Sequence, residues 1–443
     1  MLPPAGHPLA SPVESVPADV LIFEETRWSR FLPVALTRPV FDLRVGTETL
    51  ISRVERLLKK RTAAAHSPTR SLAGAWCRHG LTAAVSASTG LESNGPLKGA
   101  TLLLNGRGIW RELPDAGPGG SWLGVAGPNG PVACLFADDD LAPKLQPADL
   151  ISLGDGTDRF PTLPRRDVSN CVELLDWPWK LVQKNRELLL ADLGSELRLG
   201  ELPAGGLRAE GIYLLNSSQI RIGEGGKIWP ANVIDAEEGP VWIGERVRIL
   251  PHCSIQGPAF IGDDCLLQAG TVIRGGTTLG PCCKVGGEIE GSIFQGYSNK
   301  QHTGFLGHSY VGSWANLGAG CSNSDLKHTY GTVRVPINGT EVETVEMFVG
   351  ALIGDHAKIG INCSIPTGTS IGFASAVSGS RCPKFVPSFA WIEEGRLEAY
   401  EPTRALAVAQ RMMARRQKSM SDAEQAGFLA SAAVARQWEQ AAR

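Results

Sequence analysis

The chain has 443 residues, of which 43% are hydrophobic and 52 are glycine, and its 43 basic and 45 acidic residues leave a net charge of -2. This length allows two or three domains, and the balanced charge gives no electrostatic argument for nucleic acid or an anionic membrane as a partner. No apolar run approaches the ~20 residues that a transmembrane helix needs, the N-terminus lacks the pattern of a signal peptide, and the ten cysteines contain no CxxC pair, so we expect a reduced cytoplasmic compartment.

The first part of the chain predicts an α/β domain. Residues 1–18 are Pro-rich and indicate a disordered tail. Buried strands are expected at 19–23, 101–104 and 132–136, and apolar residues at helical spacing predict a helix over 47–58. A linking helix over 176–193, beginning after Pro178, would close this domain, to which we assign residues 19–205.

A strict six-residue repeat dominates the second part. Aliphatic residues return at every sixth position in the following runs: Ile222, Ile228, Ile234; Ile243, Ile249, Ile255, Ile261, Leu267, Ile273, Leu279, Val285; Phe305, Val311, Leu317; and Ile353, Ile359, Ile365, Ile371, Val377. Neither a helix nor an exposed strand has this period, whereas hexapeptide repeats mark a parallel β-helix in which three hexads make one coil. Gly244, Gly262 and Gly280 recur every 18 residues, as expected for one tight corner per coil.

We assign residues 206–398 to this β-helix and residues 399–443 to a helical tail that packs on it or on a second copy. Two stretches, 286–304 and 321–347, break the six-residue period. Insertions into a solenoid leave its core as surface loops, and such loops commonly carry function.

The densest polar cluster of the chain lies at 297–327, around the first of these loops and the turn Gly318-Ala319-Gly320. It contains His302 and His308, and a histidine in an exposed loop can exchange a proton near neutral pH. The backbone amides of the glycine-rich turn can approach a cofactor or a developing oxyanion closely. The alternative is that His302 is an ordinary solvated histidine, and the loop by itself does not decide between the two.

Three groups of motifs give the chain a resemblance to a known family. They are TRPVFDLRVG early, PWKLVQKN in the middle, and GYSNKQHTGFLGHSYVG, NLGAGCSNSDLK and GDHAKIGINCSIPTGT late. From 19 to 391 the chain resembles a divergent bacterial branch of the bifunctional UDP-N-acetylglucosamine diphosphorylase / glucosamine-1-phosphate N-acetyltransferase family. The resemblance implies a nucleotidyltransferase-like α/β domain followed by a left-handed β-helix acyltransferase domain.

The resemblance also implies roles for particular residues of the β-helix. His302 matches the general base that deprotonates the sugar amine, a step that the attack on a thioester requires. Arg274 matches an arginine that holds the sugar phosphate, to which a guanidinium is well suited, and Asn316 matches a sugar contact. Residues implied to line the acetyl-CoA site are Gly318, Ala319 and Ala351.

Two positions depart from the family pattern. A sugar-contacting tyrosine is Phe305 here, and a sugar-site lysine falls near Glu290, so we expect Lys300 or Lys327 to supply that charge.

The N-terminal domain lacks the Gly-rich phosphate loop of common sugar nucleotidyltransferases. Arg38 and Arg44 are our candidates for binding the nucleotide phosphates, with structural salt bridges as the alternative. Nucleotidyl transfer is expected to need Mg²⁺, but its ligands are not identified: Asn105 stands where an aspartate is expected, and Asp138 to Asp140 are unspecific candidates.

The sequence therefore predicts a bifunctional transferase. Its β-helix would acetylate glucosamine 1-phosphate with acetyl-CoA, and its N-terminal domain would transfer a uridylyl group from UTP to the product, in a homotrimer. One alternative is a sugar-1-phosphate nucleotidyltransferase whose β-helix only assembles, regulates or takes another acyl acceptor. A zinc hydrase using His302, His308 and His328 and a non-enzymatic trimeric scaffold are further alternatives.

Overall fold

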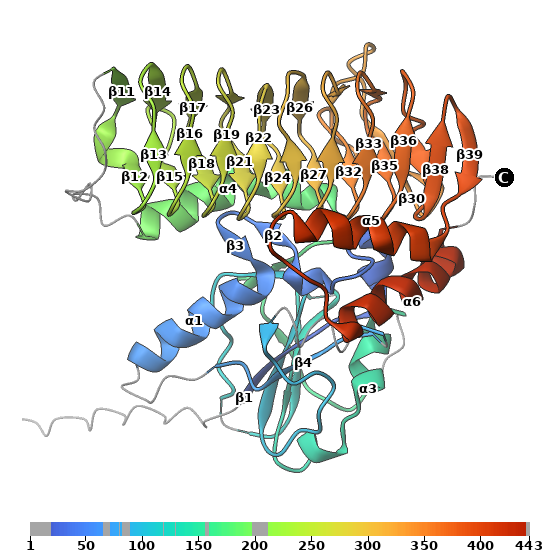
Figure 1. The fold of residues 1–443 in the computed structure, drawn as a ribbon. Helices are drawn as coiled ribbons and strands as arrows, with labels where there is room; N and C mark the ends of the chain where they lie inside the picture. The colour runs from blue at the N-terminus through green and yellow to red at the C-terminus, as the bar shows by residue number, and fades with distance from the viewer. Residues whose placement is uncertain are drawn as a thin grey trace, which may run out of the picture.

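The computed structural model describes residues 19–64, 71–78, 80–81, 89–117, 119–128, 130–155, 159–196 and 211–439. The expected tail at 1–18 and a hinge expected at 202–206 lie outside these ranges. Within them, an α/β domain lies beside a long solenoid, and two C-terminal helices lie across the junction (Figure 1).

The N-terminal domain is built on a six-stranded mixed sheet in the order β4-β1-β5-β8-β7-β9. Its strands are β1 Asp19–Phe23, β4 Gly74–Trp76, β5 Thr101–Asn105, β7 Trp122–Val125, β8 Val132–Ala137 and β9 Arg165–Asp167. The three predicted strands are therefore confirmed. β1, β4 and β5 run parallel to one another, and β8 is antiparallel to β5.

Helices cover both faces of this sheet. α1, Leu50–Ala64, buries Ile51, Val54 and Leu58 against one face, and the short α3, Pro147–Ile151, buries Leu150 against the other. α1 begins later than the predicted helix because residues 44–49 form a hairpin of β2 Arg44–Val45 and β3 Glu48–Thr49. A separate two-stranded antiparallel sheet pairs β6 Gly108–Trp110 with β10 Val172–Leu174.

The linking helix is confirmed as α4, Trp179–Glu196. Its buried Asn185 joins the two halves of the molecule: Oδ1 accepts from the amide of Gly46 at 2.7 Å, and Nδ2 donates to the carbonyl of Gly276 at 2.7 Å. One side chain thus satisfies backbone groups of the β2–β3 turn and of a solenoid coil.

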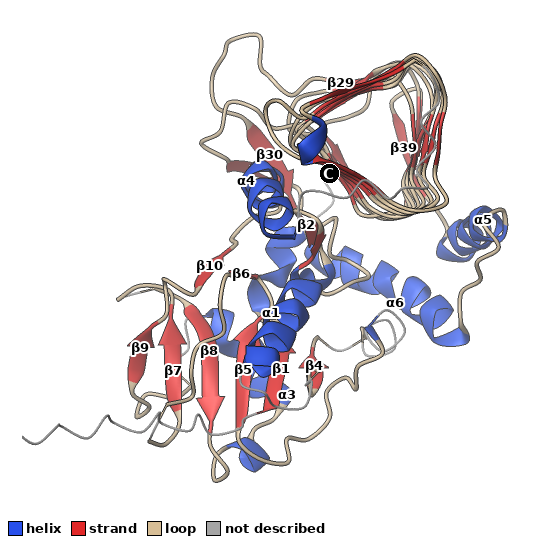
Figure 2. Ribbon diagram, turned by 90° about the vertical axis from the view of Figure 1, so that its left-hand side faces the viewer, coloured by secondary structure: helices blue, strands red, loops and turns tan. Residues whose placement is uncertain are grey.

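The solenoid is a parallel β-helix with three faces, and the view along it in Figure 2 shows superposed triangular coils. Face 1 comprises β11 Ile212–Leu215, β14 Asn232–Asp235, β17 Ser254–Gln256, β20 Val272–Ile273, β23 Glu288–Glu290 and β26 Phe305–Gly307, continued by the pair β29 Ser322–Asn323 and β34 Ser364–Ile365. Face 2 comprises β12 Ile220–Ile222, β15 Val241–Ile243, β18 Ala259–Ile261, β21 Thr277–Leu279, β24 Ile293–Phe294, β27 Tyr310–Val311, β32 Leu352–Ile353, β35 Ser370–Ile371 and β37 Phe385–Val386. Face 3 comprises β13 Lys227–Ile228, β16 Arg248–Ile249, β19 Leu266–Leu267, β22 Lys284–Val285, β25 Asn299–Lys300, β28 Asn316–Leu317, β33 Lys358–Ile359, β36 Ala376–Ser378, β38 Ala390–Glu393 and the antiparallel β39 Arg396–Ala399.

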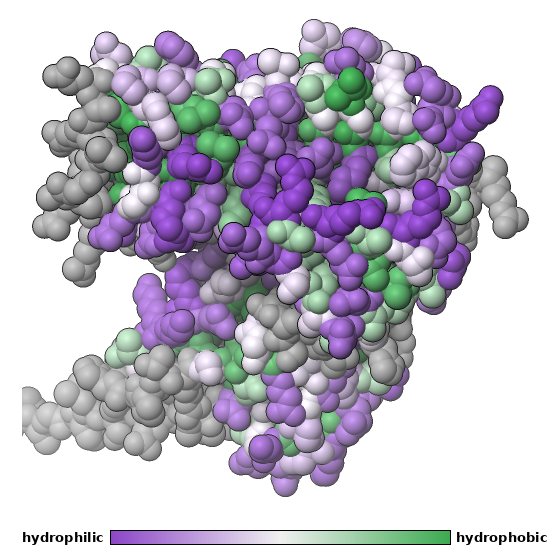
Figure 3. Space-filling model, viewed as in Figure 1, coloured by the Kyte–Doolittle hydropathy of each residue, from purple (hydrophilic) through white to green (hydrophobic). Residues whose placement is uncertain are grey.

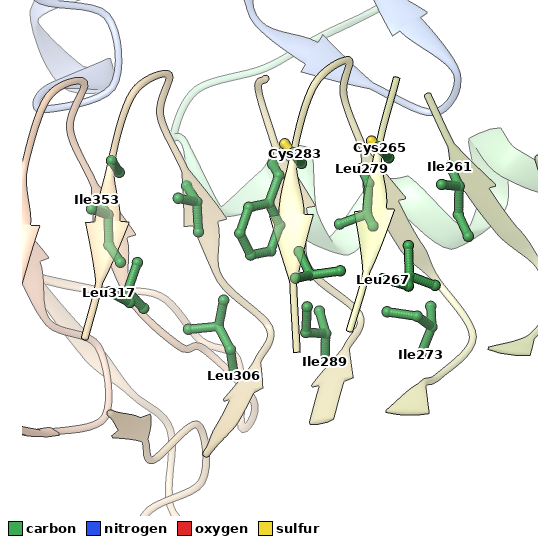
Figure 4. Packing of buried hydrophobic residues seen from close by; sticks show 14 of the residues in the cluster. Ile261, Cys265, Leu267, Ile273, Leu279, Cys283, Ile289, Leu306, Leu317 and Ile353 are labelled. Atoms are coloured by element: carbon green, nitrogen blue, oxygen red, sulfur yellow. The ribbon is translucent and has the colours of Figure 1, made fainter. Parts of the chain in front are cut away.

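The predicted six-residue register is right for most coils and wrong in one place. Residues 286–304 do not leave the core as a loop but form a shortened coil, in which Ile289 and Phe294 point inward. On the following strand of face 1 the inward residue is Leu306, not Phe305, because Leu306 stands opposite Ile289 in the ladder (Figure 4). The second stretch, 321–347, does leave the solenoid and carries a hairpin of β30 Arg334–Ile337 and β31 Thr340–Glu343.

Glycine is required at the corners by the approach of the next coil. A Cβ at Gly262 would lie 2.9 Å from a backbone carbon of Gly280, and one at Gly280 would lie 2.2 Å from the carbonyl oxygen of Gln295. Neither residue has a positive φ, so the requirement is space and not backbone conformation.

The C-terminal tail forms two helices, α5 Pro402–Ala414 and α6 Asp422–Trp438. Phe428 of α6 packs edge to face on Phe373 of the solenoid, and Trp438 packs on Trp28 of the N-terminal domain. Residues 28–45, face 2 and these helices share one hydrophobic core. Within the described residues no helix is long and apolar enough to cross a membrane.

Candidate active site

His302 lies in the corner between β25 and β26, where its side chain is exposed. In the next coil the same corner is the turn Gly318-Ala319-Gly320, and the amide of Gly320 donates to the carbonyl of Thr303 at 3.1 Å. The amide of Gly318 donates to Ile359, so among the described residues Ala319 keeps the one amide of this turn without a backbone acceptor. The structure thus brings His302 beside the glycine-rich turn.

Lys300 occupies an inward position of the hexad pattern, opposite Val285 in the ladder, and is buried. Its ammonium donates to the carbonyls of Gly286 and His302, each at 3.0 Å, and burial lowers its pKa to about 8. The sequence-based expectation that Lys300 supplies a charge to the sugar is therefore wrong. The side chain points into the solenoid and connects the corner of His302 to the preceding coil.

Lys300→Met is expected to change how stability depends on pH. Above pH 8 the folded protein loses this proton while the unfolded chain, with a lysine pKa of ~10.4, keeps it, so Lys300 makes stability rise between about pH 8 and 10. The midpoint of thermal unfolding, measured at pH 7 and pH 10, should therefore rise less in the variant than in the wild type. The exposed Lys60→Met serves as control, and equal rises in all three proteins would contradict the assignment.

Asn316 lies on face 3, where its Oδ1 accepts from Asn299 Nδ2 at 3.3 Å. Asn299 Oδ1 in turn accepts from Arg416, just after α5, at 2.6 Å. A hydrogen-bonded chain therefore connects the predicted sugar contact to the C-terminal segment, a link that no local sequence pattern predicts.

Arg274 follows β20, two strands before β26 on face 1, and its exposed guanidinium pairs with Glu288. Strands about 4.8 Å apart place β20 and β26 roughly 10 Å from each other. Arg274 follows its strand, whereas His302 precedes β26, so the two lie at opposite corners of one face.

The two remaining candidates differ in accessibility. Lys327 is half-buried in the segment after β29, and its ammonium donates to the carbonyl of Thr332. Ala351 is fully buried in the solenoid core, so it offers no surface to acetyl-CoA within this chain.

A second histidine, His308, bonds to a carboxylate, whereas the side chain of His302 has no such partner among the described residues. Nδ1 of His308 lies 2.8 Å from the carboxylate of Asp325, and its ring packs on Phe348 at 5.3 Å. Asp325 belongs to the segment that leaves the solenoid, so this pair fastens the base of that segment to the corner after β26. His302, His308 and His328 do not converge on one metal site: no group of three metal-binding side chains occurs among the described residues.

Arg38 and Arg44 both face the solenoid. Arg38 donates to Asp355 at 2.7 Å, Asp42 at 2.9 Å and Ser313 at 3.1 Å. The guanidinium of Arg44 donates to Thr47 at 2.7 Å. The alternative of structural salt bridges therefore describes Arg38, whereas the Arg44 side chain bonds to a backbone carbonyl, and neither is directed at the edge of the N-terminal sheet.

The carboxyl ends of β1 and β5, where open α/β sheets bind ligands, carry buried charges that pair with each other. Glu24 pairs with Arg78 at 2.5 Å, and Glu25 pairs with Arg107. Asp138 and Asp139 instead lie at the opposite edge, where they accept from backbone amides of Leu141 and Ala100. No group of three metal-binding side chains occurs in the described chain, and the carboxylates named here are bonded to protein groups, so none is identified as a ligand of Mg²⁺.

Comparison with known proteins finds similarity to sugar nucleotidyl transferases and to bifunctional GlmU proteins. Residues 20–195 match a family model described as sugar nucleotidyl transferase. Over 124 residues the chain is 33% identical to a bifunctional protein GlmU of Methanococcus vannielii, with 28% of each chain covered. Over part of its length the chain is similar to bifunctional GlmU proteins.

Another curated relative is also described as bifunctional. The chain is 30% identical over 230 residues to a bifunctional sugar-1-phosphate nucleotidylyltransferase/acetyltransferase of Sulfurisphaera tokodaii, covering 39% of this chain and 57% of that protein. It spans 28% to 57% of the length of the first curated relatives. A crystal structure of Arabidopsis UDP-N-acetylglucosamine acyltransferase matches 53% of this chain and 96% of its own at 12% identity and a TM-score of 0.26. The solenoid itself is a parallel β-helix, and its left hand stays a prediction from the resemblance.

Proposed function

We propose that the solenoid transfers the acetyl group of acetyl-CoA to the amine of glucosamine 1-phosphate. The observation that carries this proposal is the exposed His302 beside the free amide of Ala319, on a hexapeptide solenoid of a GlmU-like chain. The sugar binds at the corner of His302, which faces its amine, and the guanidinium of the long, exposed Arg274 side chain is the candidate for reaching its phosphate. Asn316 and Lys327 are the further polar side chains that contact the sugar in this proposal.

The reaction follows from these positions. His302 accepts a proton as the sugar nitrogen attacks the thioester carbon. The amide of Ala319 donates to the oxygen that becomes negative. The C–S bond then breaks, an amide bond remains on the sugar, and CoA leaves as a thiolate that takes up a proton.

The experiment that tests this proposal is release of free thiol from acetyl-CoA. We expect release that requires glucosamine 1-phosphate and stops when glucose 1-phosphate, which has no amine, replaces it. Mass spectrometry should find one acetyl group added per sugar. A folded protein that releases no thiol with the amino sugar, or equal thiol with both sugars, would refute the proposal.

We propose uridylyl transfer from UTP to N-acetylglucosamine 1-phosphate for the N-terminal domain. The match of residues 20–195 to the sugar nucleotidyl transferase family supports it. No step is assigned to Mg²⁺, since no carboxylate of the described chain is identified as its ligand. Pyrophosphate release that depends on both UTP and the sugar phosphate would establish this activity, and its absence would leave the domain a structural partner of the solenoid.

A cytoplasmic homotrimer completes the proposal. All ten cysteines are free thiols, which fits a reducing compartment, and Ile361 and Phe348 expose large apolar side chains that a neighbouring copy would cover. Light scattering after size exclusion should give three times the chain mass.

A further inference from the structure

A cavity of about 170 Å³ lies where the N-terminal domain, the solenoid and the C-terminal helices meet. Its walls include Arg38 of the N-terminal domain, Trp314 and His356 at the corner between faces 2 and 3, Met413 of α5 and Phe428 of α6. The two helices lie across this junction in Figure 1, and Figure 3 shows a mainly hydrophilic outer surface along α5. Met413 and Phe428 are buried and thus belong to the inner side of these helices.

Aromatic rings form one wall of this junction cavity. The rings of Trp314 and His356 are nearly parallel, with their centres 6.4 Å apart and their planes 11° apart. Phe373 and Phe428 each meet the ring of His356 edge to face, at 5.8 Å and 5.5 Å. An apolar protein cavity of about 150 Å³ is large enough to take up benzene. The size and the walls of the junction cavity therefore suit a ligand built on one six-membered aromatic ring.

Carboxylates outnumber cations around the cavity. Among the described residues that line it, Arg38 is the one basic residue, against the acidic residues Asp42, Asp355 and Glu424. Arg38 is shared between Asp42 at 2.9 Å and Asp355 at 2.7 Å. Oε2 of Glu424 accepts from the amide and the hydroxyl of Ser421, whereas Oε1 accepts nothing from the described chain. The lining therefore carries an excess of negative charge, which attracts a cation.

His356 adds an uncharged hydrogen-bonding group to the same wall. Burial lowers the pKa of His356 well below its usual value, and Lys358 and Arg38 lower it further, so the ring is neutral at pH 7. Its buried Nδ1 has no hydrogen-bond partner among the described residues. A neutral imidazole has one nitrogen that donates and one that accepts. The lining thus combines aromatic rings, carboxylates and a neutral imidazole, a combination that suits an aromatic ring bearing N–H donors.

We propose that the junction cavity binds a small aromatic amine, with its ring among Trp314, Phe373 and Phe428 and its ammonium group toward Glu424. Aromatic faces attract cations as carboxylates do. This site is separate from the proposed acetyl-transfer corner, because Trp314 precedes β28 whereas His302 follows β25, so the two occupy different corners of the solenoid. Since three parts of the chain form its walls, a bound amine stabilises their docking on one another.

The test is a ligand-observed NMR titration of the full chain with benzylamine, benzyl alcohol and benzoate, which share one ring and differ in charge. We expect the wild type to bind benzylamine with a dissociation constant of about 1 mM or below, a usual strength for so small a ligand. Benzyl alcohol should bind at least about tenfold more weakly, and benzoate should not bind. Benzylamine should also raise the midpoint of thermal unfolding.

Two pairs of variants locate the ligand. A Cβ at Gly427 of α6, which lines the cavity, meets one described atom, a carbonyl oxygen at 4.0 Å, so Gly427→Met should fill the cavity and weaken benzylamine binding at least about tenfold. Ala426→Met, at an exposed position of α6, is the control. Glu424→Gln keeps the capping box of α6 but should abolish the preference for the amine over the alcohol. Asp422→Asn, in the same first turn but outside the lining, should keep that preference.

Three results would overturn the proposal: a wild type that binds none of the three compounds, equal affinity of the wild type for amine and alcohol, or wild-type affinity for benzylamine in a folded Gly427→Met variant. If Gly427→Met does not fold, Glu424→Gln decides, because an unchanged preference for the amine in that variant would overturn the proposal. Neither acetyl-CoA nor a sugar takes part in these titrations, so the result does not depend on the proposed acetyl transfer.

Discussion

His302→Asn is expected to lower kcat for acetyl transfer to glucosamine 1-phosphate by about 10²–10⁴-fold, with little change in either KM. Asparagine keeps a polar side chain in the exposed corner between β25 and β26 but cannot take a proton from the ammonium. Because His302 makes no hydrogen bond through its side chain within the described chain, its removal should leave the corner intact, held by Lys300 from inside.

The measurement is steady-state thiol release over a range of sugar and acetyl-CoA concentrations. His252→Asn is the control, because His252 is an exposed histidine in the corresponding corner of an earlier coil. A variant at position 302 with wild-type kcat would show that another group takes the proton. His308, held by Asp325, would then be the next side chain to replace.

Arg38→Met is expected to destabilise the protein by about 3–5 kcal/mol, the usual effect of breaking a buried ion pair from one side. The Arg38 and Asp355 side chains are 16% and 6% exposed. Burial raises the pKa of the Asp42 carboxyl, Arg38 opposes this rise, and Asp355 adds to it. Without the guanidinium, two carboxylates face each other between the N-terminal domain and the solenoid with no cation between them.

Urea unfolding followed by tryptophan fluorescence measures this loss. The control is Arg111→Met, whose pair with Glu173 is 49% and 35% exposed and should contribute less than about 1 kcal/mol. A double variant, Arg38→Met/Asp355→Asn, should recover part of the stability because it removes one of the two carboxylate charges that the loss of Arg38 leaves unpaired. Equal midpoints for Arg38→Met and the wild type would contradict the assignment of Arg38 to the interdomain contact.

The hexad pattern predicted the solenoid because every inward position repeats one physical requirement. Each coil must bury an aliphatic side chain on each face, and this requirement appears in the sequence at a fixed period. The prediction failed at Phe305, since 286–304 is a coil shortened at its corners and not an insertion. The period alone does not distinguish these two possibilities, whereas the ladder from Ile289 to Leu306 does.

The orientation of Lys300 in the candidate site was mispredicted for the same reason, because the shortened coil was not recognised. A lysine beside a histidine in a polar segment was expected to face a substrate, yet its place in the hexad turns it inward. Counting six residues from Phe294 to Lys300 and six more to Leu306 would have revealed this once the shortened coil was known. Arg38 and Arg44 were similarly ambiguous, because a salt bridge and a phosphate site require the same side chain.

By itself the sequence determined the parallel β-helix, the linking helix after Pro178, the first strands of the α/β domain, and the corner of His302 beside Gly318-Ala319-Gly320. These features depend on residues close in the chain or on a period that repeats along it. Only the tertiary structure decided the partner of Arg38, the pair of His308 with Asp325, and the packing of His356 on Phe428. Those partners lie from 17 to 317 residues apart, and no local pattern records which distant surfaces a folded chain brings into contact.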